Sequence, residues 1–287
     1  MLFLSNVYIF YKNSFVLIGM TGNLRSIWKG SISFGLVNIP IKLYTATYDK
    51  EFSFNQLDKK SHKVQYKKWC PIENKEVPYS EIKKGYEISR DNYVIIEKED
   101  LNKIKLKTTK TIDIKEFIDY NDFDPILVEK SYYVAPDSKA SADKAYSLFV
   151  KAIKETNKIA IGKVVLREKE NLVALRAYQR GMVMHQLRYM DEIKPVNEIE
   201  GMPDASQPKI DSKELSLGKT LVENLSNEEF DPSQYSDAYS NQLEQLISSK
   251  AQGKTFNSIS DEKNEDTNNN LLEALKASVQ KSKLKSK

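Results

Sequence analysis

Apolar and polar residues alternate over several short stretches of the chain, which is the pattern of strands with one buried face. In residues 27–44, IWKGSISFGLVNIPIKLY, the apolar positions change parity next to Gly35. This change predicts one long strand with a bulge or corner, a common device in barrels. Further strands are predicted at residues 93–96, 110–118 and 131–136.

An apolar stripe with helical spacing follows these strands, and Ser141 can cap the helix that carries it. The stripe consists of Ala142, Tyr146, Phe149 and Ile153. Residues 159–190 then divide into three apolar-rich runs, separated by EKE and QR. These runs predict a three-stranded meander, with Gly181 supplying the conformation of its second turn.

Residues 201–210 form a polar linker, and residues 211–250 predict two amphipathic helices. The first helix opens with a capping box, Asp211-x-x-Glu214. The second opens with Asp231 as its cap, a proline at N1 and a glutamine at N3. Their stripes are Leu215, Leu221, Val222 and Leu225, and Tyr235, Tyr239, Leu243 and Leu246. So short a pair cannot bury both stripes by itself, so we expect it to dock on a partner.

The two ends of the chain differ from its middle. Residues 1–19 are apolar but interrupted, too short to span a membrane, and lack the features of a secretory signal. We favour Met20 as the true start, with an extra strand or membrane-surface anchor as the alternative. No later segment could span a membrane. By composition, residues 251–287 predict a flexible, lysine-rich tail.

The chain shows little that could perform catalysis. A single cysteine excludes an internal disulfide framework and fits a reducing compartment. No phosphate-binding or nucleophile-elbow motif occurs. His185 shares strand parity with Val183, Leu187 and Tyr189, as a core or half-buried histidine does. Cys70 and Glu73 make a poor zinc pair without further cysteines. We therefore expect no enzyme, no cofactor and no metal.

Positive charge is concentrated although the whole chain carries only +4. Residues 59–84 contain eight lysines and three glutamates, an excess larger than that of the whole chain. A solvated loop face is the plain alternative. The unusual length of the unpatterned segment 51–92 and the second lysine cluster in the tail favour contact with phosphates instead.

Arginines of the meander extend this candidate surface if Arg176 faces outwards. The predicted contacts to nucleic acid are Lys59, Lys60, Lys63, Lys67, Lys68, Lys83, Lys84, Arg167, Arg176, Arg180, Lys281, Lys283 and Lys285.

Five segments closely resemble the bacterial Ku family, the end-binding factors of non-homologous end joining. They are LRSIWKGSISFGLVNIPIKLYTATYDKEFSFNQL, VPYSEIKKGYE, KTIDIKEFIDYNDFDPI, YYVAPD and KIAIGKVVLREKENLVALRAY. The resemblance runs in consistent order from about residue 24 to residue 250. Residues 1–19 lie outside it.

The resemblance implies a mixed β and α fold with a β-barrel core over residues 20–200. It implies a homodimeric ring threaded by duplex DNA, with residues 51–92 as the bridge arm. Two legs of about 20 residues each extend about 66 Å, more than the width of a duplex. Residues 211–250 would be a helical arm that packs on the partner subunit.

The function implied is sequence-independent binding of double-stranded DNA ends and recruitment of an ATP-dependent DNA ligase. No cofactor is implied, and the place of action is the nucleoid in the cytoplasm. A β-barrel RNA-binding module or an unrecognised hydrolase is the alternative.

Overall fold

The computed structural model describes residues 24–104, 110–138, 142–203, 210–227, 229–255 and 271–285. The chain divides into two compact units, Met1–Glu198 and Ile199–Lys287. Within the described ranges, no helix combines the length and the apolar character needed to cross a membrane. The predictions for residues 1–19 lie outside the described part.

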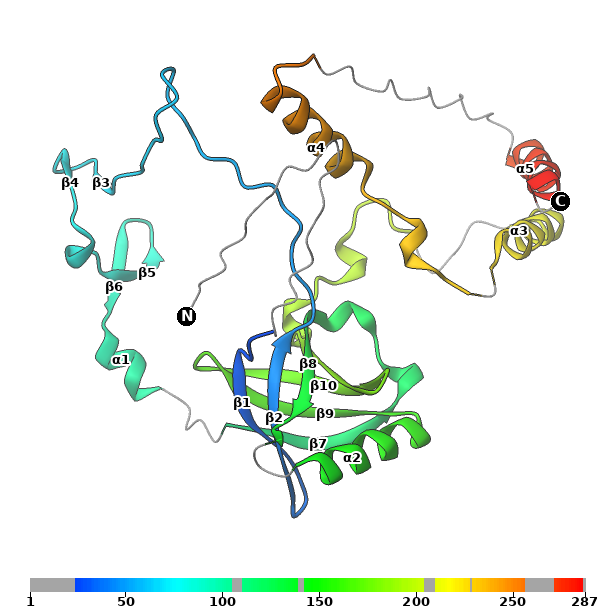
Figure 1. Ribbon diagram of the computed structural model, residues 1–287, viewed down its shortest axis with the longest axis horizontal. Coiled ribbons are helices and arrows are strands. Elements are labelled where there is room, and N and C mark those ends of the chain that lie inside the picture. Colours follow the sequence, from blue (N-terminus) through cyan, green and yellow to red (C-terminus); the bar gives the residue numbers. More distant parts are fainter. Residues whose placement is uncertain are drawn as a thin grey trace. The chain divides into compact units, whose positions relative to one another are not determined.

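Seven strands of the first unit close into a barrel (Figure 1). Around the barrel the order is β1-β2-β8-β11-β10-β9-β7, and every neighbouring pair is antiparallel except β1 and β7. The strands are β1 (Trp28–Phe34), β2 (Val37–Thr45), β7 (Thr111–Asp119), β8 (Val128–Pro136), β9 (Lys158–Leu166), β10 (Lys169–Tyr178) and β11 (Gly181–Leu187). The predicted barrel and its three-stranded meander, β9 to β11, are confirmed.

The prediction of one continuous strand over residues 27–44 is wrong. β1 and β2 form an antiparallel hairpin in which Phe34 lies opposite Val37. Gly35 takes a left-handed φ of +56°, and Leu36 is fully exposed at the turn. A two-residue turn shifts the apolar parity just as a bulge does, so the pattern alone does not separate the two.

The barrel interior is filled by branched side chains from facing strands. Ile32 lies opposite Ile39, and both have no exposed surface. The helix α2 (Asp143–Thr156) packs on β9, β10 and β11. Its predicted stripe is confirmed, because Tyr146, Phe149 and Ile153 are buried in the barrel's core cluster. Ala142 is the N-cap residue, and Ser141 lies outside the described residues.

Gly181 does not supply the turn between β10 and β11, contrary to the prediction from the sequence. The turn consists of Gln179 and Arg180, and Gln179 takes the left-handed φ of 48°. Gly181 is needed for space instead, since a Cβ there would lie 3.0 Å from the hydroxyl of Tyr146. That hydroxyl donates to the carbonyl of Val134 and accepts from the backbone N–H of Met182.

The chain between β2 and β7 forms two small hairpins outside the barrel. We call residues 51–104 the β2–β7 segment. It contains β3 (Trp69–Cys70) paired with β4 (Lys75–Glu76), and β5 (Lys84–Ser89) paired with β6 (Asn92–Ile96). The helices η1 (Tyr79–Glu81) and α1 (Lys98–Lys103) lie between and after them. The predicted strand at residues 93–96 is thus β6 and pairs outside the barrel.

The second unit is helical. It contains α3 (Ser212–Leu225), η7 (Pro232–Gln234), α4 (Ala238–Ala251) and α5 (Leu271–Lys285). The capping box of α3 is confirmed, since Asp211 accepts from the backbone N–H of Lys213 and Glu214 accepts from that of Asp211. In the described part of the first unit, further short 3₁₀ helices are η2 (Tyr120–Asp122), η3 (Pro125–Leu127), η5 (Met190–Glu192) and η6 (Val196–Glu198).

The predicted start of the second helix is wrong by several residues. Asp231 accepts from the backbone N–H of Ser233 and closes only the short turn η7. A second cap, Asp237, accepts from the backbone N–H of Ser240 and begins α4. Tyr235 therefore lies before the helix rather than on its stripe.

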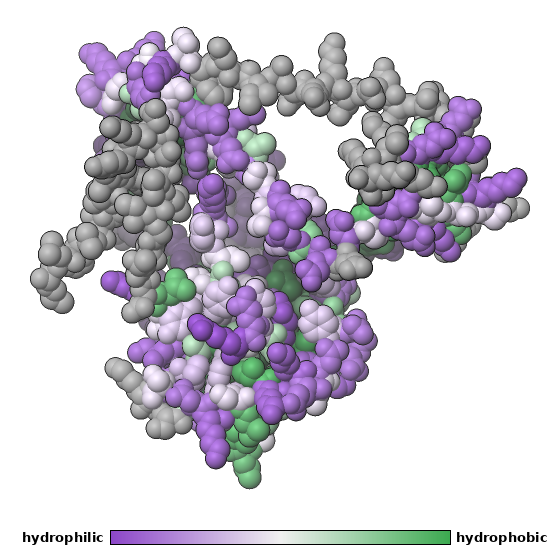
Figure 2. All heavy atoms as spheres, turned by 45° about the vertical axis from the view of Figure 1, so that its right-hand side comes forward, coloured by the Kyte–Doolittle hydropathy of each residue, from purple (hydrophilic) through white to green (hydrophobic). Residues whose placement is uncertain are grey.

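The predicted flexible tail is helical over α5, which packs against α3 (Figure 1). On the face drawn in Figure 2, apolar residues gather where these two helices lie together. Leu275 and Val279, four residues apart, lie on one side of α5, and Val279 is buried. The tail is rich in lysine and polar residues, so its overall composition predicts disorder. Composition does not detect a short apolar repeat of this kind.

Candidate nucleic-acid interface

A tight turn in the β2–β7 segment presents the first predicted lysines. The carboxylate of Asp58 accepts hydrogen bonds at 2.8 Å from the backbone N–H groups of Lys60 and His62. These bonds, that from His62 first, lower the pKa of Asp58 below its usual value. Leu57 and Lys63 pair across the turn in a β-bridge. The turn therefore places Lys59 and Lys60 at the tip of a short loop.

Most of the predicted lysines of this segment have no counter-charge. Lys67 pairs with Glu76 at 2.6 Å, and Lys83 lies 3.5 Å from Glu97. Among the described residues, no carboxylate lies within ion-pair distance of the other five, which are Lys59, Lys60, Lys63, Lys68 and Lys84. Residues 59–84 therefore carry positive charge that the glutamates among them do not neutralise.

The β2–β7 segment has no core of its own. None of residues 51–104 is buried. Large apolar side chains such as Tyr79 and Tyr86 are 87% and 69% exposed, and Trp69 is 56% exposed. Exposed apolar surface on this scale is typical of a segment that another molecule covers.

The predicted arginines of the barrel do not form one rim. Arg167 and Glu168 form the turn between β9 and β10, both with left-handed φ, whereas Arg180 lies in the turn between β10 and β11. These turns lie at opposite ends of β10, roughly 30 Å apart along the strand. Arg176 and Arg180 share one end of β10, and Arg167 lies at the other.

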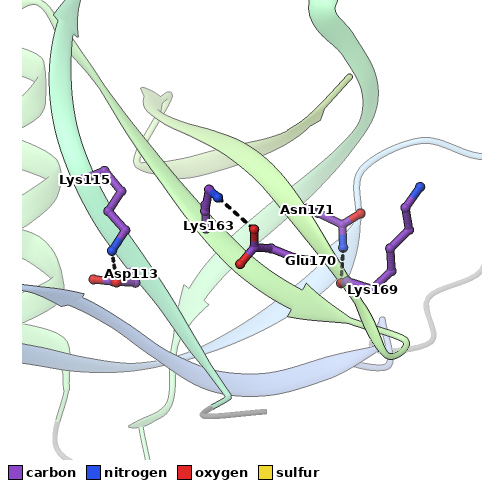
Figure 3. Close-up of polar contacts among 6 residues, drawn as sticks. All are labelled: Asp113, Lys115, Lys163, Lys169, Glu170 and Asn171. Carbon is purple, nitrogen blue, oxygen red and sulfur yellow. Dashed lines mark hydrogen bonds and ion pairs between the residues drawn. The ribbon is translucent and has the colours of Figure 1, made fainter. Parts of the chain in front are cut away.

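Lysines on β7 and β9 are neutralised within the sheet (Figure 3). Lys163 on β9 donates to Glu170 on β10 at 2.8 Å, and Lys115 pairs with Asp113 on β7. The bond with Glu170 raises the pKa of Lys163 above its usual value. These lysines therefore offer less attraction to an external anion than the unpaired lysines of the β2–β7 segment.

Arg176 faces outwards, as the prediction of a basic surface requires. Its neighbour Leu175 is buried in the barrel core, so Arg176 lies on the opposite face of β10. Its Nε donates to Nε2 of His185 at 2.9 Å, and its guanidinium carbon lies 5.3 Å from the ring centre of Tyr178. Arg176 is half-buried, and these two contacts orient its guanidinium.

His185 is buried, which confirms the prediction of a structural histidine. Its Nδ1 lies 2.9 Å from Oγ of Ser131 on β8, and the ring of Phe123 stacks on it at 6.2 Å. Burial lowers the pKa of His185, and the charge of Arg176 lowers it further. The imidazole is therefore neutral near pH 7 and accepts the hydrogen bond from Arg176.

Sequence reasoning missed the side chains that hold His185 and Tyr178, the two partners of Arg176. Ser131 comes from β8, Phe123 from the segment after β7, and Tyr133 stacks on Tyr178 at 6.3 Å. Strand parity signals the burial of His185. The strand order β8-β11-β10 brings Ser131, His185 and Arg176 together. The pairing of β8 with β11 joins segments far apart in the sequence, so no local pattern predicts it.

The family model and the curated relatives all identify Ku proteins, and their matches cover most of the chain. The family model of the Ku70/Ku80 beta-barrel domain matches residues 33–217. This chain belongs to the Ku family. The match begins in β1, ends in α3 and includes the β2–β7 segment, so the segment is part of the Ku domain.

Three relatives show the extent of the similarity, and each is named a non-homologous end joining protein Ku. That of Archaeoglobus fulgidus is 43% identical over 262 residues, which cover 90% of this chain and 99% of the relative. That of Heliobacterium modesticaldum is 38% identical over 265 residues, 92% and 94% of the two chains. That of Bacillus subtilis is 38% identical over 234 residues, 81% and 74%.

The predicted partner contacts of this Ku chain are not buried within it. Leu215, Val222, Leu225, Tyr235 and Tyr239 are exposed. Leu221, Leu243 and Leu246 are half-buried. Lys281, Lys283 and Lys285 lie on α5, but their side chains are outside the described part.

Metal ligands do not cluster in the part of the chain that the structure describes. No group of three or more histidine, cysteine, aspartate or glutamate side chains could hold an ion there. Cys70 is a free, half-buried thiol at the end of β3.

Proposed function

We propose that this chain binds the ends of double-stranded DNA, independently of sequence, in non-homologous end joining. The relatives named above support the pathway. The observation that carries the proposal is the exposed loop of unpaired lysines in a segment inserted into a Ku barrel. Lysines that contact phosphates position a protein on DNA without reading its bases, which accounts for binding at any sequence.

We further propose that two copies assemble into a ring. Residues 51–92, which have no buried residue and carry exposed aromatic side chains, are the bridge arm that the partner copy and the DNA cover. A closed ring loads only at a free end, so its preference for ends comes from topology. The exposed side chains of α3 and α4 are candidates for contact with the partner copy and with an ATP-dependent DNA ligase at the nucleoid.

In this proposal the chain only binds DNA ends, and the ligase forms the phosphodiester bonds that join them. The electrostatic attraction is to the phosphate backbone, and bound copies can slide inwards from the end because no base contact fixes them. No cofactor is needed for such binding.

Gel retardation of one DNA fragment in two topologies tests the ring. We expect the protein to retard the linear duplex and to leave the relaxed closed circle of the same sequence free. Cutting the circle once with a restriction enzyme restores binding. Equal affinity for circle and linear duplex contradicts the ring, and tighter binding to a hairpin RNA of matched length supports an RNA-binding module instead.

A further inference from the structure

Arg176 is a half-buried cation without an anionic partner in the described part of the chain. The other half-buried cations on the strands of this barrel each have a carboxylate. These pairs are Lys42–Asp137, Lys158–Asp119 and Lys163–Glu170, at 2.7, 2.8 and 2.8 Å. The partners of Arg176 are instead an imidazole and an aromatic ring, both neutral. A partly desolvated cation is stabilised by a counter-ion, so the surroundings of Arg176 favour the binding of an anion.

The hydrogen bond to His185 decides which part of the guanidinium remains available. Nε is used by Nε2 of His185, so the four N–H groups of the two Nη atoms have no described acceptor. Tyr178 lies against the guanidinium and is itself stacked on Tyr133. A planar pair of Nη atoms with its orientation fixed is the geometry that binds phosphate oxygens in a bidentate way.

His185 is oriented by its second nitrogen. Because Nε2 accepts from Arg176, the proton of the neutral ring lies on Nδ1, which donates to Oγ of Ser131 at 2.9 Å. Ser131 lies directly opposite His185 in the β8–β11 register. Phe123 stacks on the ring and limits its rotation. Three neighbouring strands thus fix the acceptor before any ligand arrives.

We propose that Ser131 and His185 are positioning residues that hold Arg176 as a phosphate-binding fork on the outer face of the barrel. The phosphate is that of the DNA backbone, so the inference rests on the proposed function. Each copy contributes one fork. The orientation of Arg176 is set before binding, so the complex does not lose side-chain entropy there.

The test measures affinity for a short end-labelled duplex by fluorescence anisotropy at several salt concentrations. Arg176→Gln weakens binding and makes the slope of log K against log salt shallower by about 0.9 for each fork that contacts a phosphate. His185→Leu weakens binding roughly three- to tenfold, because the fork loses its fixed orientation. His185→Gln, whose amide oxygen also accepts from Nε, restores most of the affinity.

Lys163→Gln is the matched control, since it removes one positive charge from the same barrel but from a residue paired with Glu170. We expect its slope to equal that of the unmodified protein. A slope change as large as that of Arg176→Gln would mean that net charge, not the fork, is responsible, and would overturn the inference.

The experiment distinguishes a wrong assignment of the Arg176 fork from a wrong proposed function, because the two give different results. If the unmodified protein binds ends and Arg176→Gln binds with unchanged slope and affinity, the fork is refuted and end binding stands. If the unmodified protein does not bind ends, the proposed function fails first. Should Arg176→Gln not fold, the pair His185→Leu and His185→Gln still decides, because equal affinities of the two contradict a positioning role.

Discussion

The burial of His185 affects the stability of the barrel as well as the orientation of Arg176. Burial, and then the charge of Arg176, lower the pKa of this histidine in the folded protein. In an unfolded chain a histidine titrates at about pH 6.5. The unfolded state therefore takes up the proton at a higher pH than the folded state does. This contribution to stability is complete above pH 6.5 and is lost as the pH falls towards the lower folded pKa.

We predict that the free energy of unfolding falls between pH 7.5 and pH 5.5, and that His185→Gln reduces this fall. A glutamine at this position accepts from Arg176 but does not titrate. Denaturant unfolding followed by tryptophan fluorescence at the two pH values measures the difference. His62→Gln is the control, because His62 is the other histidine of the chain and is exposed. An equal pH dependence in all three proteins would contradict the prediction.

At the residue scale, the sequence predicts where charge accumulates but not which charges are free. Counting lysines over residues 59–84 identifies the loop. It does not reveal that Lys67 and Lys83 meet Glu76 and Glu97, because these partners lie across hairpins whose pairing depends on turn geometry. The same limit applies to Arg176, whose acceptor comes from a neighbouring strand.

At the scale of elements, predictions succeed where one local rule dominates. The capping box at Asp211 and the stripe on α2 are of this kind. Predictions fail where two local solutions are nearly equivalent. A turn and a bulge at Gly35 change parity alike, and Asp231 and Asp237 are both good caps six residues apart. The apolar periodicity of α5 is weak in the sequence. The helix buries apolar side chains by packing against α3, which its composition does not predict.

The packing of α3 against α5 leads to a prediction at this scale. Val279→Asp places a charge at a side chain that is only 8% exposed, so α5 separates from α3 rather than bury it. We expect faster amide exchange in α3 and α5 and an unchanged melting temperature of the barrel, which belongs to the other unit. Hydrogen exchange followed by mass spectrometry measures both helices.

Ser278→Asp is the control for this experiment, since it adds the same charge to an exposed position of α5. We expect it to leave the exchange of α3 unchanged. If Ser278→Asp accelerates exchange as much as Val279→Asp does, helix propensity and not the packing against α3 is responsible.

For the whole molecule, the uneven distribution of charge matters more than its total. The chain carries +4, while residues 59–84 alone have five more lysines than glutamates. The β2–β7 segment that contains them has no buried residue, so its order cannot come from a core of its own. A surface of this kind gains most from a partner that is uniformly negative and from a second copy that covers its apolar side chains.

The unpaired lysines should therefore dominate the salt dependence of end binding. We predict that replacing Lys59, Lys60, Lys63 and Lys68 by glutamine makes the slope of log K against log salt shallower by about 0.9 for each phosphate that the variant no longer neutralises. Replacing Lys67 and Lys83, which have glutamate partners, should change it less per charge removed. Sedimentation velocity checks that both variants keep the oligomeric state of the unmodified protein. Equal changes per charge in the two variants would show that pairing within the segment does not decide which lysines meet the DNA.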